Sequence, residues 1–182
     1  TTVDDAKQWL VNHINSENDT IVQTAQRYHT LNGMATTLVV AVIFANEMVV
    51  ANIGDSRAYV IRQKQMRQLT TDHNLANELL QEGAITQDEA VTHPGRHLIT
   101  RQLGVTEDSK ADVFAISIQP DDYILMTTDG MPKHISDEEI LQIILAAPEI
   151  SQAVTQLITL TNEAGGSDNV TVLIGHQESE VN

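Results

Sequence analysis

Residues 36–55 have the sequence TTLVVAVIFANEMVVANIGD, and this stretch decides the fold. Residues 36–44 are rich in β-branched side chains, and residues 48–53 form a second apolar run, a composition typical of strands. The intervening residues 45–47 predict the turn of a β-hairpin. Because the second run ends at a glycine followed by Asp55, a carboxylate is expected where a buried strand meets a loop.

Two further aspartates lie at the same kind of border. Asp129 follows the apolar run 123–126, and Asp168 precedes the run 170–174. Each aspartate taken singly is also a residue type that stabilises turns by bonding local backbone. Carboxylates gathered from distant parts of a chain are compensated most simply by Mg²⁺ or Mn²⁺, which take oxygen ligands. Together with Asp55, the pattern therefore favours a divalent-metal site.

The remaining pattern combines helices with antiparallel strands. Apolar residues at helical spacing predict a first helix near the start of the chain, and Asn18 or Asp19 is expected to cap a second. Capping-box sequences begin further helices at Thr86 and Ser136. Residues 72–104 form a helical and loop insertion between strands, either a mobile flap or an ordinary connector. Further strands are predicted over residues 58–62, 66–69, 113–118, 123–126 and 170–174, and further helices over 74–82 and from 150 to the glycines at 165 and 166.

This order of elements predicts the α+β class in a single domain, residues 1–182. The chain has 182 residues and a formal net charge of −15, from 25 acidic and 10 basic residues. Such a charge repels nucleic acid and anionic membrane surfaces, so neither is expected as a partner. No cysteine is present, which excludes disulfides, thiolate catalysis and zinc–thiolate sites. Neither a signal-peptide pattern nor an apolar stretch of membrane-spanning length is found, so a cytoplasmic protein is expected.

Histidine offers another route to metal binding or acid–base chemistry, because imidazole titrates near neutral pH. The candidates are His73, His93, His97 and His134. Their spacing matches no zinc signature, so structural or solvated roles are expected. His134 lies five residues after Asp129, which makes it the histidine of greatest interest.

Three short motifs occur along the chain: IGDSR at residues 53–57, TTDG at 127–130 and GGSDNVT at 165–171. In this order they resemble the PPM/PP2C family of metal-dependent protein serine/threonine phosphatases, in its compact bacterial form. Further matches to the family lie at residues 33–37, 69–73, 93–96 and 99–104. The resemblance runs from about the first helix to Gly175.

The resemblance implies a four-layer sandwich, in which two antiparallel sheets are flanked by helices. It implies that Asp129 and Asp168 are ligands of a pair of Mg²⁺ or Mn²⁺ ions, and that Asp55 contributes to a more weakly bound third ion. The nucleophile is then a metal-bound water, so no side chain is expected to attack the substrate. The implied substrates are phosphoserine and phosphothreonine in proteins, the products of a cognate serine/threonine kinase.

The family's leading Asp-Gly-x-Gly-Gly motif has no match in the chain. The chain is therefore expected to lack the family's first two strands, which would impair its activity as it stands. Ala35 and Pro132 also stand where other residues are common in the family. These departures keep open an alternative function, a non-catalytic phosphatase-like module that binds a partner protein.

Overall fold

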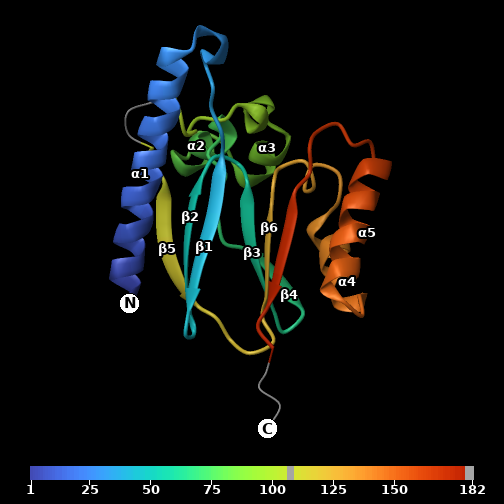
Figure 1. The fold of residues 1–182 in the computed structure, drawn as a ribbon. Coiled ribbons are helices and arrows are strands. Elements are labelled where there is room, and N and C mark those ends of the chain that lie inside the picture. The colour runs from blue at the N-terminus through green and yellow to red at the C-terminus, as the bar shows by residue number, and fades with distance from the viewer. Residues whose placement is uncertain (106–108, 179–182) are drawn as a thin grey trace. The chain divides into compact units, whose positions relative to one another are not determined.

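The computed structural model describes residues 1–105 and 109–178, so residues 106–108 and 179–182 of the predicted domain lie outside the description (Figure 1). Its elements fall into two compact units. Unit 1 comprises Thr1–Asp55 and Thr71–Ser117, and unit 2 comprises Ser56–Thr70 and Ile118–Asn182. Each unit contains one antiparallel sheet, and each is described by itself.

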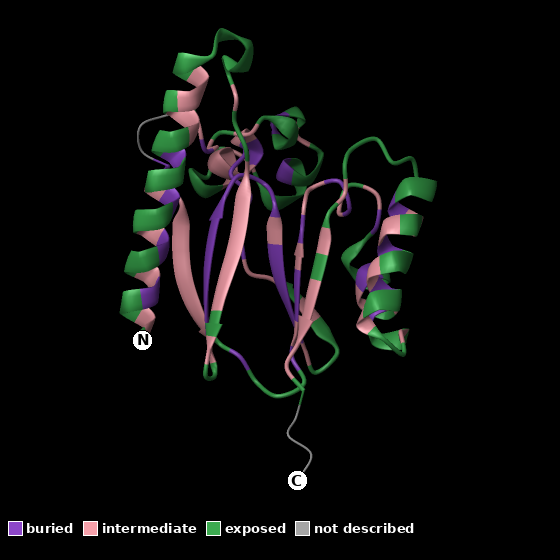
Figure 2. Ribbon diagram, in the orientation of Figure 1, coloured by how far each residue is buried: buried purple, intermediate pink, exposed green. Residues whose placement is uncertain are grey.

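The sheet of unit 1 is built on the predicted hairpin. Strands β1 (Leu38–Phe44) and β2 (Glu47–Ile53) pair antiparallel, and β5 (Asp112–Ser117) pairs with the other side of β2. The turn is closed by Ala45, whose φ of 47° lies in the left-handed region. Because β2 is the central strand, it is buried along almost its whole length (Figure 2). A buried strand leading to Asp55 is thus confirmed.

One long helix, α1 (Val3–Arg27), covers the sheet of unit 1 (Figure 1). Thr2 and Asp5 form its capping box, and its buried apolar residues belong to the same core as β2. The prediction of a second helix capped at Asn18 or Asp19 was wrong. Asn18 is fully buried in the middle of α1, where its Oδ1 accepts a hydrogen bond of 2.8 Å from the backbone N–H of Gly104. The short 3-10 helix η1 (His29–Leu31) follows α1.

Short helices separated by loops lie in the segment between β4 and β5. They are α2 (Leu75–Gln81), α3 (Gln87–Thr92) and the 3-10 helix η2 (Pro94–His97). The capping box predicted at Thr86 is present and begins α3, because the Thr86 side chain accepts from the N–H of Glu89 while the Glu89 carboxylate accepts from the N–H of Thr86.

The sheet of unit 2 has the strand order β4-β3-β6-β7. Its strands are β3 (Arg57–Arg62), β4 (Gln65–Gln68), β6 (Tyr123–Thr127) and β7 (Val172–His176). The closing strand begins two residues later than predicted. The reason is that the N–H of Thr171 donates to the side chain of Thr128, at 3.0 Å, before the ladder with β6 begins.

Two helices complete unit 2. The capping box predicted at Ser136 begins α4 (Asp137–Ala146), and α5 (Ile150–Glu163) follows it. Their apolar residues form one core with the sheet, which includes Tyr59, Ile61, Leu125, Ile140, Ile144 and Leu157. The α+β class, with two antiparallel sheets and helices packed on them, is confirmed.

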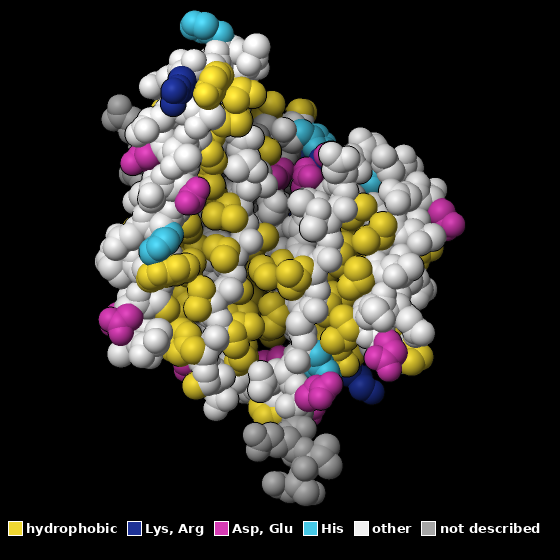
Figure 3. Space-filling model, in the orientation of Figure 1, with side chains coloured by type: hydrophobic (Ala, Val, Ile, Leu, Met, Phe, Trp, Pro, Cys, Tyr) yellow, Lys and Arg dark blue, Asp and Glu magenta, His cyan; other side chains and the backbone are white. Residues whose placement is uncertain are grey.

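The two sheets also expose apolar strands at their edges. Strand β1 is an edge strand of unit 1 and β7 is an edge strand of unit 2. Ile43 on β1 and Leu173 on β7 are each 52% exposed, and hydrophobic side chains are visible over β1 in Figure 3. Within the described residues, no helix combines the length and apolar character needed to cross a membrane.

Candidate metal centre

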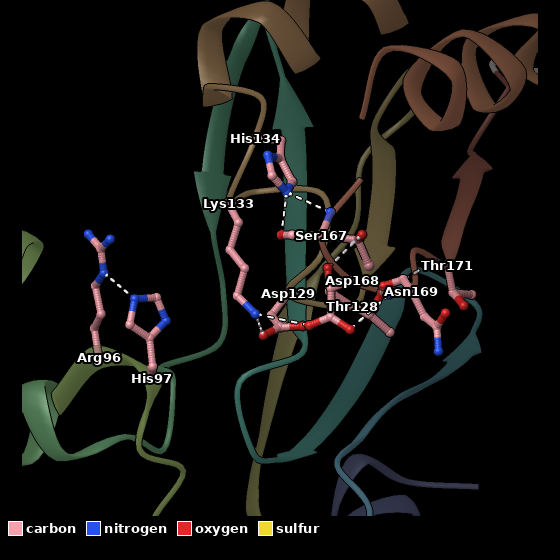
Figure 4. Close-up of polar contacts among 11 residues, drawn as sticks. Arg96, His97, Thr128, Asp129, Lys133, His134, Ser167, Asp168, Asn169 and Thr171 are labelled. Carbon is pink, nitrogen blue, oxygen red and sulfur yellow. Dashed lines mark hydrogen bonds and ion pairs between the residues drawn. The ribbon is translucent and has the colours of Figure 1, made fainter. Parts of the chain in front are cut away.

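In unit 2, the loop after β6 is bound to the loop before β7. The backbone N–H of Thr128 donates to the carbonyl of Thr171 at 3.2 Å, and the N–H of Thr171 donates to Thr128 Oγ1. Thr128 Oγ1 also donates to the carbonyl of Asn169 at 3.4 Å. These bonds extend the β6–β7 pairing beyond the strands and hold two aspartate-bearing turns together (Figure 4).

Gly130 allows the two turns to approach closely. A Cβ atom at this position would lie 2.3 Å from the carbonyl oxygen of Asn169 and 3.6 Å from the Cβ of Asp168. The first of these distances is shorter than any non-bonded contact, so a side chain would force the turns apart. The pairing of Asp129 with a following glycine in the sequence therefore has a direct packing reason.

Asp129 and Asp168 share a single cation, the ammonium of Lys133. Lys133 Nζ forms an ion pair with Asp129 Oδ2 and lies 3.1 Å from Asp168 Oδ2. Figure 4 shows the ammonium reaching both carboxylates from the turn that follows β6. The three side chains are 33%, 27% and 46% exposed for Lys133, Asp129 and Asp168 respectively, so the cluster is open to solvent.

Hydrogen bonds shift the pKa values of Lys133 and Asp168. Partial burial lowers the pKa of the Lys133 ammonium, but its bonds to Asp129 and Asp168 outweigh that effect and the net shift is upward. The bond from Lys133 and then the backbone N–H of Asn169, at 2.8 Å, lower the pKa of the Asp168 carboxyl. The opposite charges of Lys133 and Asp168 favour the ionised form of both groups.

His134 holds the loop that carries Asp168. Its Nε2 accepts from the backbone N–H of Ser167 at 3.4 Å and lies 2.9 Å from Ser167 Oγ. Because Nε2 accepts from a backbone donor, the Ser167 hydroxyl donates to the same nitrogen and the ring proton resides on Nδ1. Among the predicted candidates, His134 is thus a support for the loop next to Asp168.

The carboxylate oxygens of Asp129 and Asp168 are suitable ligands for a divalent cation. Because one ammonium contacts both carboxylates, one small cation can also reach both. Among the described residues, no group of three or more histidine, aspartate or glutamate side chains is arranged to hold a metal ion. A site with two carboxylates suits Mg²⁺, which keeps several waters and takes only one or two carboxylates from protein.

Asp55 lies in unit 1, at the end of β2, and is 8% exposed. The turn that carries it depends on Gly54, whose φ is +104°. A Cβ atom at Gly54 would lie 2.3 Å from Thr37 Cγ2. The turn therefore requires a glycine for its backbone conformation and for its packing.

A buried histidine fixes the same turn from the other side. The N–H of Gly54 donates to His73 Nδ1 at 3.1 Å, and the N–H of His73 donates to the carbonyl of Gly54. Because Nδ1 accepts, the ring proton is on Nε2, which donates to Asp112 at 3.0 Å. Arg101 also donates to Asp112, at 3.2 Å. The structural role predicted for His73 is confirmed.

The structure brings Asp129 and Asp168 together, whereas Asp55 belongs to the other unit. Lys133 was not predicted from the sequence. A cation four residues after Asp129 was a usable signal, because side chains four residues apart meet where the chain is helical or tightly turned. Its contact with Asp168 had no signal in the sequence, because that contact depends on the pairing of two distant turns.

Comparison with known proteins decides the family. Residues 2–79 match the family described as Protein phosphatase 2C. The serine/threonine phosphatase stp of Listeria innocua is 38% identical over 173 residues, which make up 95% of this chain and 69% of the Listeria protein. The chain belongs to the PP2C family of protein phosphatases.

Solved structures of serine/threonine phosphatases share its fold. The serine/threonine phosphatase Stp1 of Staphylococcus aureus has a TM-score of 0.90 and 36% identity, over 98% of this chain and 70% of that one. The catalytic domain of PstP, solved in complex with 2 manganese ions, has a TM-score of 0.80 and 33% identity, over 91% of this chain and 68% of that one. This PP2C chain is therefore a protein phosphatase, and dependence on a divalent metal fits its family.

Proposed function

We propose that this PP2C phosphatase hydrolyses phosphoserine and phosphothreonine in proteins, with Mg²⁺ or Mn²⁺ held by Asp129 and Asp168. The observation that carries this proposal is the shared cation, since a single ammonium contacts both carboxylates. Asp55 is proposed to contribute to a third, more weakly bound ion. We further propose that residues 1–182 act as one domain and that residues 72–104 are a flap within it.

The chain's own residues would position the metal ions and supply the negative charge that binds them. A bound pair of divalent ions would activate a water and neutralise the phosphoryl oxygens, which are the two obstacles to hydrolysis of a phosphate monoester. Asp129 and Asp168 provide the negative charge that holds such ions. The bonds between Thr128 and Thr171 fix the spacing of the two carboxylates, and the N–H of Asn169 orients Asp168. No nucleophilic side chain is required.

The substrate is proposed to be a phosphoprotein produced by a cognate serine/threonine kinase in the cytoplasm. A cysteine-free composition suits that compartment. The relatives reported above are phosphatases, which favours the enzyme over the alternative of a non-catalytic binding module.

The test is a phosphatase assay of the full-length natural protein, with p-nitrophenyl phosphate and with a phosphothreonine peptide. We expect turnover that Mn²⁺ stimulates and EDTA abolishes. Asp168→Asn keeps the size of the side chain but removes its charge, and it should lower the metal-stimulated rate by about a hundredfold or more. Turnover that is indifferent to Mn²⁺, EDTA and Asp168→Asn would refute the proposed function.

A further inference from the structure

We propose that Lys133 is a built-in competitor of the divalent cation. Its ammonium neutralises part of the Asp129 and Asp168 charge in the metal-free protein and must leave before an ion binds there. The inference rests on the proposed function, because it concerns the same carboxylate pair. It assigns to Lys133 a role in setting metal affinity.

The geometry places the ammonium where a shared cation belongs. Lys133 Nζ pairs with Asp129 and lies 3.1 Å from Asp168, and both contacts are made by Oδ2 atoms (Figure 4). The backbone N–H of Lys133 donates to the carbonyl of Asp129 at 3.3 Å, so the turn after β6 holds the lysine stem beside the first carboxylate. An ion that took an oxygen from each carboxylate would meet the ammonium in the same space.

Charge makes the exchange favourable. The ammonium brings one positive charge to two carboxylates and leaves a net charge of −1, whereas a divalent ion neutralises the pair. An ammonium and a divalent cation in contact with the same oxygens also repel one another. The pair therefore binds either the lysine or the divalent ion more readily than both.

The exposure of the cluster makes the exchange easy. Lys133 is 33% exposed, and ion pairs with exposed members contribute little stability. A lysine ammonium is a compact charge on a flexible stem of four carbons, so it can move to solvent without disturbing the turn. Lys133 thus lowers the apparent affinity for metal without blocking the site, and it keeps the metal-free carboxylates from repelling each other.

The test is a calorimetric titration of the full-length protein with Mn²⁺. Lys133→Met removes the competing charge and keeps much of the stem, and we expect it to tighten Mn²⁺ binding by about three- to tenfold. Lys133→Arg keeps a cation in place and should bind Mn²⁺ no tighter than the natural protein. Lys64→Met is the matched control, because Lys64 is an exposed lysine in the β3–β4 turn of the same unit. Since that variant changes the net charge equally, it should alter Mn²⁺ affinity less than twofold.

Asp168→Asn separates failure of this inference from failure of the proposed function. If Asp168→Asn leaves Mn²⁺ affinity unchanged, the carboxylate pair is not a metal site and both proposals fall. If Asp168→Asn weakens binding while Lys133→Met binds no tighter than the natural protein, only the competitor role is overturned. If methionine disturbs the turn, Lys133→Gln also tests whether removing the lysine charge tightens Mn²⁺ binding. A melting curve of each variant shows that it is folded.

Discussion

The two ends of strand β6 carry aspartates that are paired with cations in opposite ways. Before the strand, Asp122 is 1% exposed and accepts two hydrogen bonds from Arg62, of 2.9 and 2.6 Å, and a third from the backbone N–H of Gln119. After the strand, Asp129 shares one lysine with Asp168, and both carboxylates are open to solvent.

The difference separates a permanent ion pair from an exchangeable one. The planar guanidinium of Arg62 matches the two oxygens of Asp122, and such bidentate pairs are both strong and geometrically specific. Both oxygens of Asp122 accept hydrogen bonds from the protein, and the side chain is only 1% exposed, so it is closed to ligands from solvent. Lys133, in contrast, offers one charge to two carboxylates and leaves an unbalanced negative charge that solvent and ions can reach.

The largest effect on stability should come from the end of β6 that carries the buried Asp122. Asp122→Asn removes the charge that Arg62 and Gln119 surround, and we expect it to lower the free energy of unfolding by about 2–3 kcal/mol. Asp129→Asn, at the exposed end, should cost less than about 1 kcal/mol in metal-free buffer. Urea denaturation of both variants measures the contrast. Equal losses in the two variants would show that the ends of β6 do not differ as described.

A smaller effect should appear in the pH dependence of stability. Burial alone would raise the pKa of Asp122, but the bonds from Arg62 and Gln119 outweigh it and hold the pKa below the ordinary value of 3.8. A carboxyl with a lowered folded-state pKa stabilises the protein above its unfolded-state pKa, and this contribution is lost as the pH falls through the folded-state value.

The natural protein should therefore lose its greater free energy of unfolding, relative to Asp122→Asn, as the pH falls below 3.8. Urea denaturation at a series of acidic pH values, with Asp129→Asn as the comparison variant, measures the loss. A difference in the free energy of unfolding between the natural protein and Asp122→Asn that stays constant as the pH falls would contradict the ion pair assigned to Asp122 and Arg62.

Local patterns predicted the elements well, because capping boxes and apolar periodicity act within a few residues. The capping boxes at Thr86 and Ser136 are both present. Asn18 was misassigned as a helix cap because its side chain binds Gly104, a partner that no local pattern reveals. Local sequence identifies a polar residue that needs a partner, but it does not say how far along the chain the partner lies.

The candidate metal centre shows the same limit of local sequence, which does not reveal distant partners. Asp129 and Asp168 were found because each borders a strand, and borders are visible in the sequence. Asp122 was not singled out from the sequence, since its partner Arg62 is 60 residues away. Lys133 was missed because its significance depends on Asp168, which the Thr128 and Thr171 bonds bring to it.

The most direct test is to locate Mn²⁺ in crystals of the full-length protein by its anomalous scattering. We expect a manganese peak about 2 Å from an oxygen of Asp129 and from an oxygen of Asp168, with Lys133 Nζ no longer bonded to either carboxylate. Manganese bound elsewhere, with Lys133 still bridging the two aspartates, would contradict it.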